Sequence, residues 1–173
     1  YLFNPGEVEA VASRTDTADD EFLFRQGPAK GLSKIQLEDW EAVYARHAEI
    51  PNVAVFAEQA ALLKELLTTA PPDAVQQKDL DFLLTLGELF TLVVYGQLIL
   101  EQAELTGQDH DVIDQLFDVL VRDFSAFAID LHGKPSTTEA QRAWALEHVR
   151  APVVDPERFA RVQRLLDLPG HAP

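Results

Sequence analysis

Apolar residues recur with the period of an α-helix from about Gln36 almost to the end of the chain. Two shorter helices are predicted first, one stopping before Pro51 and one stopping at Pro71, because proline interrupts a helix. Their apolar faces consist of Leu37, Trp40 and Tyr44 in the first and Phe56, Ala60, Leu63 and Leu67 in the second. No segment alternates apolar and polar residues as a half-buried strand does, so the pattern predicts an all-α fold.

The clearest periodicity predicts two long central helices over residues 79–104 and 108–131. The apolar seam of the first is Phe82, Leu86, Leu89, Val93, Gly96 and Leu100, and that of the second is Ile113, Phe117, Leu120, Phe124, Phe127 and Leu131. The first helix carries further apolar residues on its other side, namely Leu83, Phe90, Val94 and Leu98. We therefore expect it to be buried nearly all round, with Gly96 allowing a neighbouring backbone to approach closely. The second helix has an Asp-rich far side, which predicts one solvated face.

Two further helices are predicted near the C-terminus. Gly133 and Pro135 form a helix-stop signal, and residues 136–139 (Ser-Thr-Thr-Glu) fit a capping box that starts a helix running to about Val149. Residues 155–157 (Asp-Pro-Glu) start the last helix, whose predicted apolar face is Phe159, Val162 and Leu166. These signals predict a helical bundle domain around two long central helices over residues 36–168, an irregular connector with short helices over residues 1–35, and a tail over residues 169–173.

The first central helix is apolar enough to raise the question of a membrane span. A span needs ~20 predominantly apolar residues, ideally without charges. Asp81 and Glu88 fall within residues 80–100. We therefore predict a core helix and no membrane span.

The composition is that of an acidic globular protein. A formal charge of −15 makes the surface repel phosphate backbones and anionic lipids, so nucleic acid and membrane surfaces are not expected partners. The chain contains no cysteine, which excludes disulfides and thiolate sites and fits a reducing cytoplasm. It opens with Tyr1 in place of an initiator methionine and has no secretory leader, so we expect a fragment, a processed product or an expressed piece of a longer protein.

The acidic and histidine residues do not have the spacing of a known metal site. No histidine has an acidic residue three positions upstream, as the di-iron helical bundles require. Asp109, Asp111, Asp114 and Asp118 resemble part of a calcium loop, but the glycine at its sixth position and the glutamate at its twelfth are missing. A solvated helix face is the better interpretation, with Asp109 and Asp111 also suited to a helix N-terminus and Asp118 pairing with Arg122. We predict no catalytic or metal-binding residue.

Neither the clustered glycines of a phosphate-binding loop nor a G-x-S-x-G serine motif occurs. Residues 25–34 depart from the acidic background, since they carry three cations and no acid. These cations, Arg25, Lys30 and Lys34, are candidates for contact with a phosphate or a carboxylate-rich partner; the alternative is an exposed connector that they keep soluble. Phe22 and Phe24 are candidates for docking onto another domain, or for packing within this chain.

Residues 83–105 (LLTLGELFTLVVYGQLILEQAEL) and 118–146 (DVLVRDFSAFAIDLHGKPSTTEAQRAWAL) resemble the C-terminal helical extension of long bacterial acyl-CoA dehydrogenases. Residues 25–32 (RQGPAKGL), with Trp40, resemble the connection that leads into it. The resemblance extends from about residue 27 to residue 162. It rests on packing and capping residues and includes no catalytic motif.

The resemblance implies a longer parent enzyme that uses FAD to remove hydrogens from the α and β carbons of an acyl-CoA thioester, with a glutamate as base. None of Glu88, Glu101 and Glu147 lies in a segment that matches that catalytic glutamate. For this chain it implies an accessory domain with a structural or assembly role. The expected partners are the catalytic domains of the same protein or a neighbouring subunit, in a cytoplasmic homo-oligomer.

A free-standing helical module that binds a partner helix or an apolar ligand between the two central helices is the alternative function. Its motivation is the aromatic content of these helices, namely Phe82, Phe90, Phe117, Phe124 and Phe127, for which ordinary core filling is the competing interpretation. An internal pocket of ~300 Å³ or more would favour the ligand-binding module. A tightly filled bundle would count against it.

Overall fold

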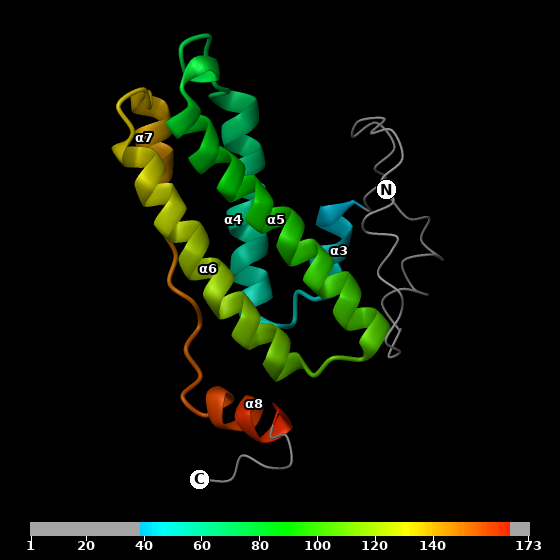
Figure 1. Cartoon of the computed structure of the whole chain (residues 1–173). Helices are drawn as coiled ribbons and strands as arrows, with labels where there is room; N and C mark the ends of the chain where they lie inside the picture. Colours follow the sequence, from blue (N-terminus) through cyan, green and yellow to red (C-terminus); the bar gives the residue numbers. More distant parts are fainter. Residues whose placement is uncertain (1–38, 167–173) are drawn as a thin grey trace, which may run out of the picture.

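The computed structural model describes residues 39–166, which form α-helices and no strand (Figure 1). The elements are α3 (Trp40–Arg46), α4 (Pro51–Thr69), the short 3-10 helix η2 (Gln76–Lys78), α5 (Leu80–Thr106), α6 (His110–Gly133), α7 (Glu139–Glu147) and α8 (Arg158–Leu166). The predicted all-α fold is confirmed for this part of the chain. The predicted connector over residues 1–35 and the tail over residues 169–173 lie outside the described residues.

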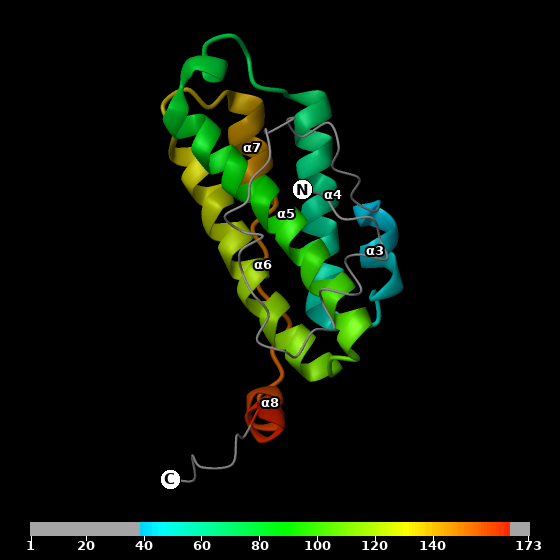
Figure 2. The same cartoon turned by 45° about the vertical axis from the view of Figure 1, so that its right-hand side comes forward.

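The two long helices that the apolar periodicity predicted are α5 and α6, and they run antiparallel and side by side (Figure 1). Helix α6 contacts α4, α5, α7 and α8, while α3 packs on α4 and α5. Helix α7 lies at the end where α6 stops, and α8 lies at the opposite end in both views (Figure 1 and Figure 2). The irregular segment between them, residues 148–157, is called the strap. The strap therefore runs the length of the bundle before α8 begins.

Side-chain caps decide where four of the helices begin. Asp39, Asp79 and Asp109 each accept hydrogen bonds from backbone N–H groups of the first turn of α3, α5 and α6. For α7 the predicted capping box is two residues too early: Thr138 is the N-cap and bonds reciprocally with Gln141. The reason is that the Thr137 hydroxyl donates to the Leu131 carbonyl at 2.6 Å and so belongs to the end of α6.

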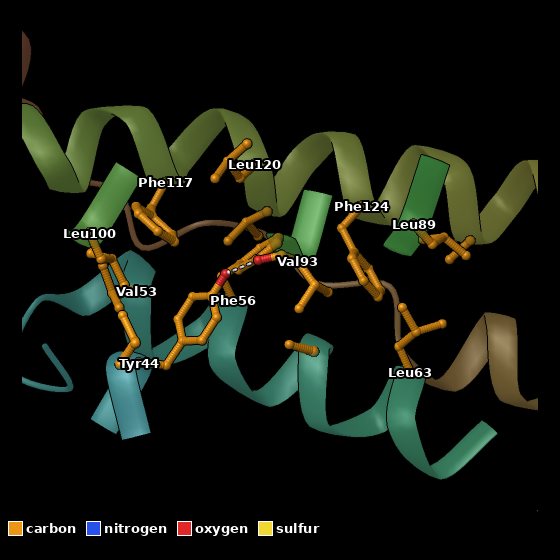
Figure 3. Packing of buried hydrophobic residues seen from close by; sticks show 14 of the residues in the cluster. Tyr44, Val53, Phe56, Leu63, Leu89, Val93, Leu100, Phe117, Leu120 and Phe124 are labelled. Atoms are coloured by element: carbon orange, nitrogen blue, oxygen red, sulfur yellow. Dashed lines mark hydrogen bonds between the residues drawn. The ribbon is translucent and has the colours of Figure 1, made fainter. Parts of the chain in front are cut away.

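The core is a stack of aromatic and aliphatic side chains between α4, α5 and α6 (Figure 3). The ring of Phe56 meets Phe117 and Phe124 edge to face, with centroids 5.6 and 5.9 Å away. The predicted seam residues are buried, except that Leu86 and Phe127 are half-buried. The aromatic residues at positions 82, 117 and 124 therefore fill the core, as the competing interpretation held.

At Gly96 the side chain of another helix approaches α5 closely, whereas a neighbouring backbone was expected there. The Tyr44 hydroxyl lies against it and donates a hydrogen bond to the Val93 carbonyl at 2.7 Å (Figure 3). A Cβ at position 96 would overlap the Tyr44 hydroxyl and would lie 3.2 Å from the Phe56 ring. Burial raises the pKa of Tyr44 well above its ordinary value, so the phenol remains a donor.

Two predictions about buried faces are wrong. Helix α5 is not buried nearly all round, because Phe90 is 58% and Leu98 45% exposed. In α8, Val162 is buried but Phe159 is 66% exposed, so the predicted apolar face does not form as a unit. Within residues 39–166, the other helices are too few and too short to surround α5 on every side.

Among the described residues, α5 alone is long and apolar enough to cross a membrane, with a mean hydropathy of 1.8 over its most apolar 18 residues. It packs on α3, α4 and α6, however, and places the polar side chains of Thr85 and Gln97 in the interior of the bundle. Only 33% of that window is buried. Helix α5 is therefore packed as a core helix on one side, while apolar side chains on its other side remain exposed.

Candidate functional site

Exposed apolar side chains form one stripe along the outer side of α5 and continue onto α6. We call this surface the α5–α6 face; it consists of Leu80, Leu84, Tyr95, Leu98, Leu116 and Val119. Leu80 is 73% and Leu84 68% exposed. The stripe on α5 follows spacings of three, four and seven residues, which place its positions on one side of the helix. These positions are 80, 84, 91, 95, 98 and 102.

A groove lies within this face, between the second half of α5 and the first half of α6. It has a volume of about 350 Å³ and is lined mainly by Tyr95, Leu98, Ile99, Val112 and Leu116. We call it the Tyr95–Leu116 groove. None of its lining residues carries a charge. A second hollow of about 260 Å³ shares Tyr95 and Leu98 with it and extends the apolar surface towards Phe90.

The chemistry of the groove is that of a binding surface. It offers apolar side chains and a few amide and hydroxyl groups, with no acid or base within it to transfer a proton. It lies between the two central helices, where a pocket was expected for an apolar-ligand module, but it is open at the surface and not internal. An apolar side chain or chain segment is the occupant that its lining fits.

Carboxylates border the groove on the side away from the α5–α6 turn. Thr85 on α5 donates to Asp130 on α6 at 2.6 Å, which fixes the antiparallel register of the two helices. Glu88 follows Thr85 on α5, and Asp123 precedes Asp130 on α6, so both lie between that bond and the groove. Both side chains are exposed. The α5–α6 face therefore has an apolar hollow and an acidic edge.

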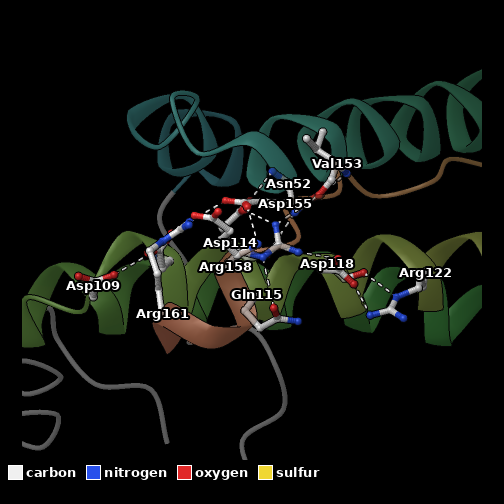
Figure 4. Close-up of polar contacts among 12 residues, drawn as sticks. Asn52, Asp109, Asp114, Gln115, Asp118, Arg122, Val153, Asp155, Arg158 and Arg161 are labelled. Carbon is white, nitrogen blue, oxygen red and sulfur yellow. Dashed lines mark hydrogen bonds and ion pairs between the residues drawn. The ribbon is translucent and has the colours of Figure 1, made fainter. Parts of the chain in front are cut away.

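A second cluster joins α8 and the strap to the bundle (Figure 4). The guanidinium of Arg158 is 4% exposed; it bonds Asp114 and lies 2.6 Å from the Asp118 carboxylate. The Asn52 backbone N–H donates to Asp114 at 2.8 Å, and the Asn52 side-chain oxygen accepts from the Val153 N–H at 2.7 Å. Each carboxylate of this cluster is engaged by a protein donor, so the cluster acts as a clamp.

The clamp corrects the prediction of a solvated Asp-rich face on α6. Asp114 and Asp118 are 7% and 8% exposed because α8 and the strap cover them. The predicted pair of Asp118 with Arg122 is present, at the edge of the cluster. Asp109 lies at the helix N-terminus as predicted, where its side chain accepts from the Asp111 N–H at 2.8 Å.

A more exposed ion pair lies beside the clamp. Arg161 bonds both carboxylate oxygens of Asp111, at 2.5 and 2.7 Å, and reaches Asp155 at 2.6 Å. The hydrogen bonds from this guanidinium lower the pKa values of Asp111 and Asp155 below their ordinary range. Asp155 also accepts from the Glu157 N–H, so it caps the turn that leads into α8, which starts at Arg158 rather than at Pro156.

The residues predicted to touch an anion, Arg25, Lys30 and Lys34, lie outside the described residues, as do Phe22 and Phe24. Among residues 39–166, no three acidic or histidine side chains are grouped to hold a metal ion. Of the glutamates considered for the parent's base, Glu88 and Glu147 are exposed, and Glu101 accepts from the Gln97 amide at 2.7 Å.

Helix N-termini are the usual anion sites, but those of α3, α5 and α6 are each taken by an aspartate cap. A second anion, such as the diphosphate of FAD, would meet a carboxylate there. FAD binding is therefore not assigned to these three termini.

The α5–α6 face is the candidate site that the sequence interpretation missed. The available signal was the apolar character of α5 on all sides, which was assigned to complete burial although the neighbouring helices are few and short. Comparison of the chain with protein-family models, with curated proteins and with solved structures finds no match.

Proposed function

We propose that this chain is an accessory helical domain with a structural or assembly role, which docks through its α5–α6 face onto the body of a larger protein. The observation that carries the proposal is the grouping of exposed Leu80, Leu84, Leu98 and Leu116 on two adjoining helices. Contiguous apolar patches on a folded domain mark interaction sites. The filled core and the fully engaged Arg158 cluster support a domain that binds rather than one that carries out a reaction.

The larger protein that we propose is an acyl-CoA dehydrogenase-like flavoprotein, a cytoplasmic homo-oligomer that oxidises acyl-CoA thioesters with FAD. Support comes from residues 83–105 and 118–146, whose sequences resemble the helical extension of such enzymes. The first segment lies within α5, and the second runs from Asp118 to the end of α6 and through most of α7. The flavin, the acyl-CoA and the glutamate base then belong to the catalytic domains, on which the α5–α6 face packs.

The visible spectrum of the intact longer gene product tests the proposal. We expect a yellow protein whose flavin absorption bleaches when a saturated acyl-CoA is added without an electron acceptor, because the flavin takes up the two electrons removed from the substrate. A colourless product, or a reading frame that encodes no catalytic domains, would defeat the proposal.

The docking surface is tested by a charge placed on the face of that same product. Leu84→Glu should weaken packing of the domain on the body, because it desolvates a carboxylate at the interface. The matched control is Ala61→Glu, at an exposed position of α4 away from the face. Limited proteolysis should release the domain faster in Leu84→Glu than in Ala61→Glu; equal rates argue against this surface.

The Tyr95–Leu116 groove favours a second candidate, a module that binds an apolar ligand. Its volume of about 350 Å³ lies at the lower end of the range of small-molecule sites, roughly 300–1,000 Å³. Titration with a fluorescent fatty acid separates the two. Saturable one-to-one binding that Leu98→Glu abolishes would favour the ligand module over a docking domain.

A further inference from the structure

The Tyr95–Leu116 groove requires an occupant, and a segment of this same chain has the chemistry to fill it. The groove offers apolar side chains, and along the two helices it is followed by the exposed carboxylates of Glu88 and Asp123. An occupant that fits both features has apolar side chains next to cations. Residues 22–34 have this order, with Phe22, Leu23 and Phe24 immediately before the acid-free basic run.

We infer that the segment Phe22-Leu23-Phe24 docks into the Tyr95–Leu116 groove, with Arg25 and Lys30 against the carboxylates of Glu88 and Asp123. The groove is uncharged in its lining, so it accepts the aromatic rings and leaves the cations at its acidic edge. The rest of the chain is strongly acidic, with a formal charge of −15 overall. The basic run is therefore attracted to this surface, whereas a second acidic copy of the chain is repelled from it.

The position at which the chain enters the described structure agrees with this docking. Residues 1–38 precede Asp39, the cap of α3, and α3 lies beside α5 (Figure 2). The residues between Phe24 and Asp39 span up to about 50 Å when extended, whereas the 27 residues of α5 are about 40 Å long. The aromatic segment therefore reaches any part of α5 from its point of attachment.

The docking divides the α5–α6 face into two parts. The connector occupies the groove at Tyr95, Leu98 and Leu116, and the end at Leu80 and Leu84 stays available for the body of the larger protein. The inference needs no flavoprotein parent, because the 173-residue chain contains both the groove and its occupant. Its failure and the failure of the proposed function are therefore separate results.

The absence of native cysteine makes disulfide trapping in the full 173-residue chain a clean test. Gln26→Cys, next to the aromatic segment, is combined with Thr91→Cys on the outer stripe of α5. The matched control combines Gln26→Cys with Ala61→Cys on α4; both partners are exposed helical positions. Docking should make the 26–91 disulfide form within one chain at least about tenfold faster than the 26–61 disulfide, because it raises the effective concentration of the two thiols.

Three further variants identify the contacts. Phe22→Ser with Phe24→Ser should bring the 26–91 rate down to that of the control pair. Glu88→Lys with Asp123→Lys should slow the 26–91 reaction, and adding Arg25→Glu with Lys30→Glu should restore it. Each substitution in this exchange replaces one charged side chain by another, and Glu88 and Asp123 are exposed. The helices should therefore form as before, and the far-UV circular dichroism spectrum is expected to be unchanged.

Equal rates for the two cysteine pairs would overturn the inference. So would a 26–91 rate that survives the Phe22→Ser and Phe24→Ser changes. A 26–91 disulfide that forms mainly between two chains, seen as a dimer on a non-reducing gel, would also overturn it and would assign the groove to a second copy.

Discussion

Arg158 of α8 and Asp118 of α6 form a buried ion pair, with Nη2 of the guanidinium 2.6 Å from Oδ2 of the carboxylate (Figure 4). Asp114 binds the same guanidinium from one turn earlier on α6. Three charged side chains thus share a site that is almost closed to water, and the guanidinium compensates the desolvation of the two carboxylates. The ion pair fixes α8 at the end of the bundle opposite α7.

Replacement of Arg158 should destabilise the protein strongly. Arg158→Met leaves the buried carboxylate of Asp114 without a cation and Asp118 with Arg122 alone, and loss of one partner costs about 3–5 kcal/mol in comparable buried pairs. Urea unfolding followed by circular dichroism measures the free energy. Arg164→Met, at an exposed position of the same helix, is the matched control and should change stability by less than about 0.5 kcal/mol.

A second set of variants distinguishes the effect of the uncompensated carboxylates on stability from the effect of lost packing. If the buried carboxylates cause the loss, then adding Asp114→Asn and Asp118→Asn to Arg158→Met should recover much of it, because no uncompensated charge remains. An Arg158→Met protein as stable as the Arg164→Met control would show that the clamp does not hold α8.

The ion pair of Arg161 with Asp111 should stabilise the folded protein at neutral pH and lose this effect at acidic pH. The guanidinium lowers the pKa of Asp111 in the folded state below its ordinary value near ~3.9. A carboxyl whose pKa is depressed by folding stabilises the protein above its unfolded pKa, and this contribution disappears as the pH falls through the folded pKa.

Urea midpoints of wild type and Arg161→Met, measured from about pH 7 down to about pH 2, test this. The gap between the two proteins should be constant in the neutral range and should shrink in acid, where Asp111 becomes protonated. The Asp155 pKa, which is also lowered by Arg161, adds to the same trend. A gap that does not depend on pH would assign the effect of Arg161 to packing alone.

Gly96→Ala and Gly87→Ala, two identical changes in α5, should have opposite effects. A Cβ at Gly96 overlaps the Tyr44 hydroxyl, so the change should cost about 1–3 kcal/mol. A Cβ at Gly87 meets nothing within 4 Å, so the same substitution should stabilise the helix by up to about 1 kcal/mol. Thermal unfolding measures both changes, and equal effects would contradict the contact with Tyr44.

The Tyr44 hydroxyl is expected to account for most of the Gly96→Ala loss. Tyr44→Phe removes the overlapping atom, so Gly96→Ala should cost less in a Tyr44→Phe background than in wild type. Additive effects of the two substitutions would place the strain elsewhere, for example at the Phe56 ring.

Helix α5 should stay packed in the bundle when lipid vesicles are present. Its apolar stripe alone would favour lipid, but Glu88 and the general acidity of the chain oppose contact with anionic headgroups. In flotation with vesicles of phosphatidylcholine and phosphatidylserine the chain should remain unbound. Co-flotation would reopen the interpretation of α5 as a membrane-active helix.

The helices themselves were largely predictable, because their signals are local. The seam from Phe82 to Leu100 predicted α5, and the break at Pro71 predicted the end of α4, to within a few residues. Pro51, predicted only as a helix stop, is the first residue of α4, and the preceding helix already ends at Arg46. The capping box was misplaced because Ser136 and Thr138 are equally good caps by type. Only the fold shows that Thr137 is needed at the end of α6.

The candidate site was less predictable, since it depends on which surfaces the fold leaves uncovered. Leu98 and Leu100 are the same residue type, two positions apart, yet one is 45% exposed and the other buried. Asp114 and Asp118 follow the pattern of a solvated face and are covered only because Arg158, 40 or more residues later, returns to them. Sequence periodicity alone does not contain these long-range contacts.

The central claim is that the end of the α5–α6 face at Leu80 and Leu84 docks onto a larger body. Hydroxyl-radical footprinting with mass spectrometry measures this directly by comparing side-chain oxidation in the 173-residue chain and in the intact longer protein. We predict that Leu80 and Leu84 react severalfold more slowly in the longer protein, whereas Leu146, an exposed leucine on α7, reacts equally in both. Equal oxidation of Leu80 and Leu84 in the two proteins would contradict the account.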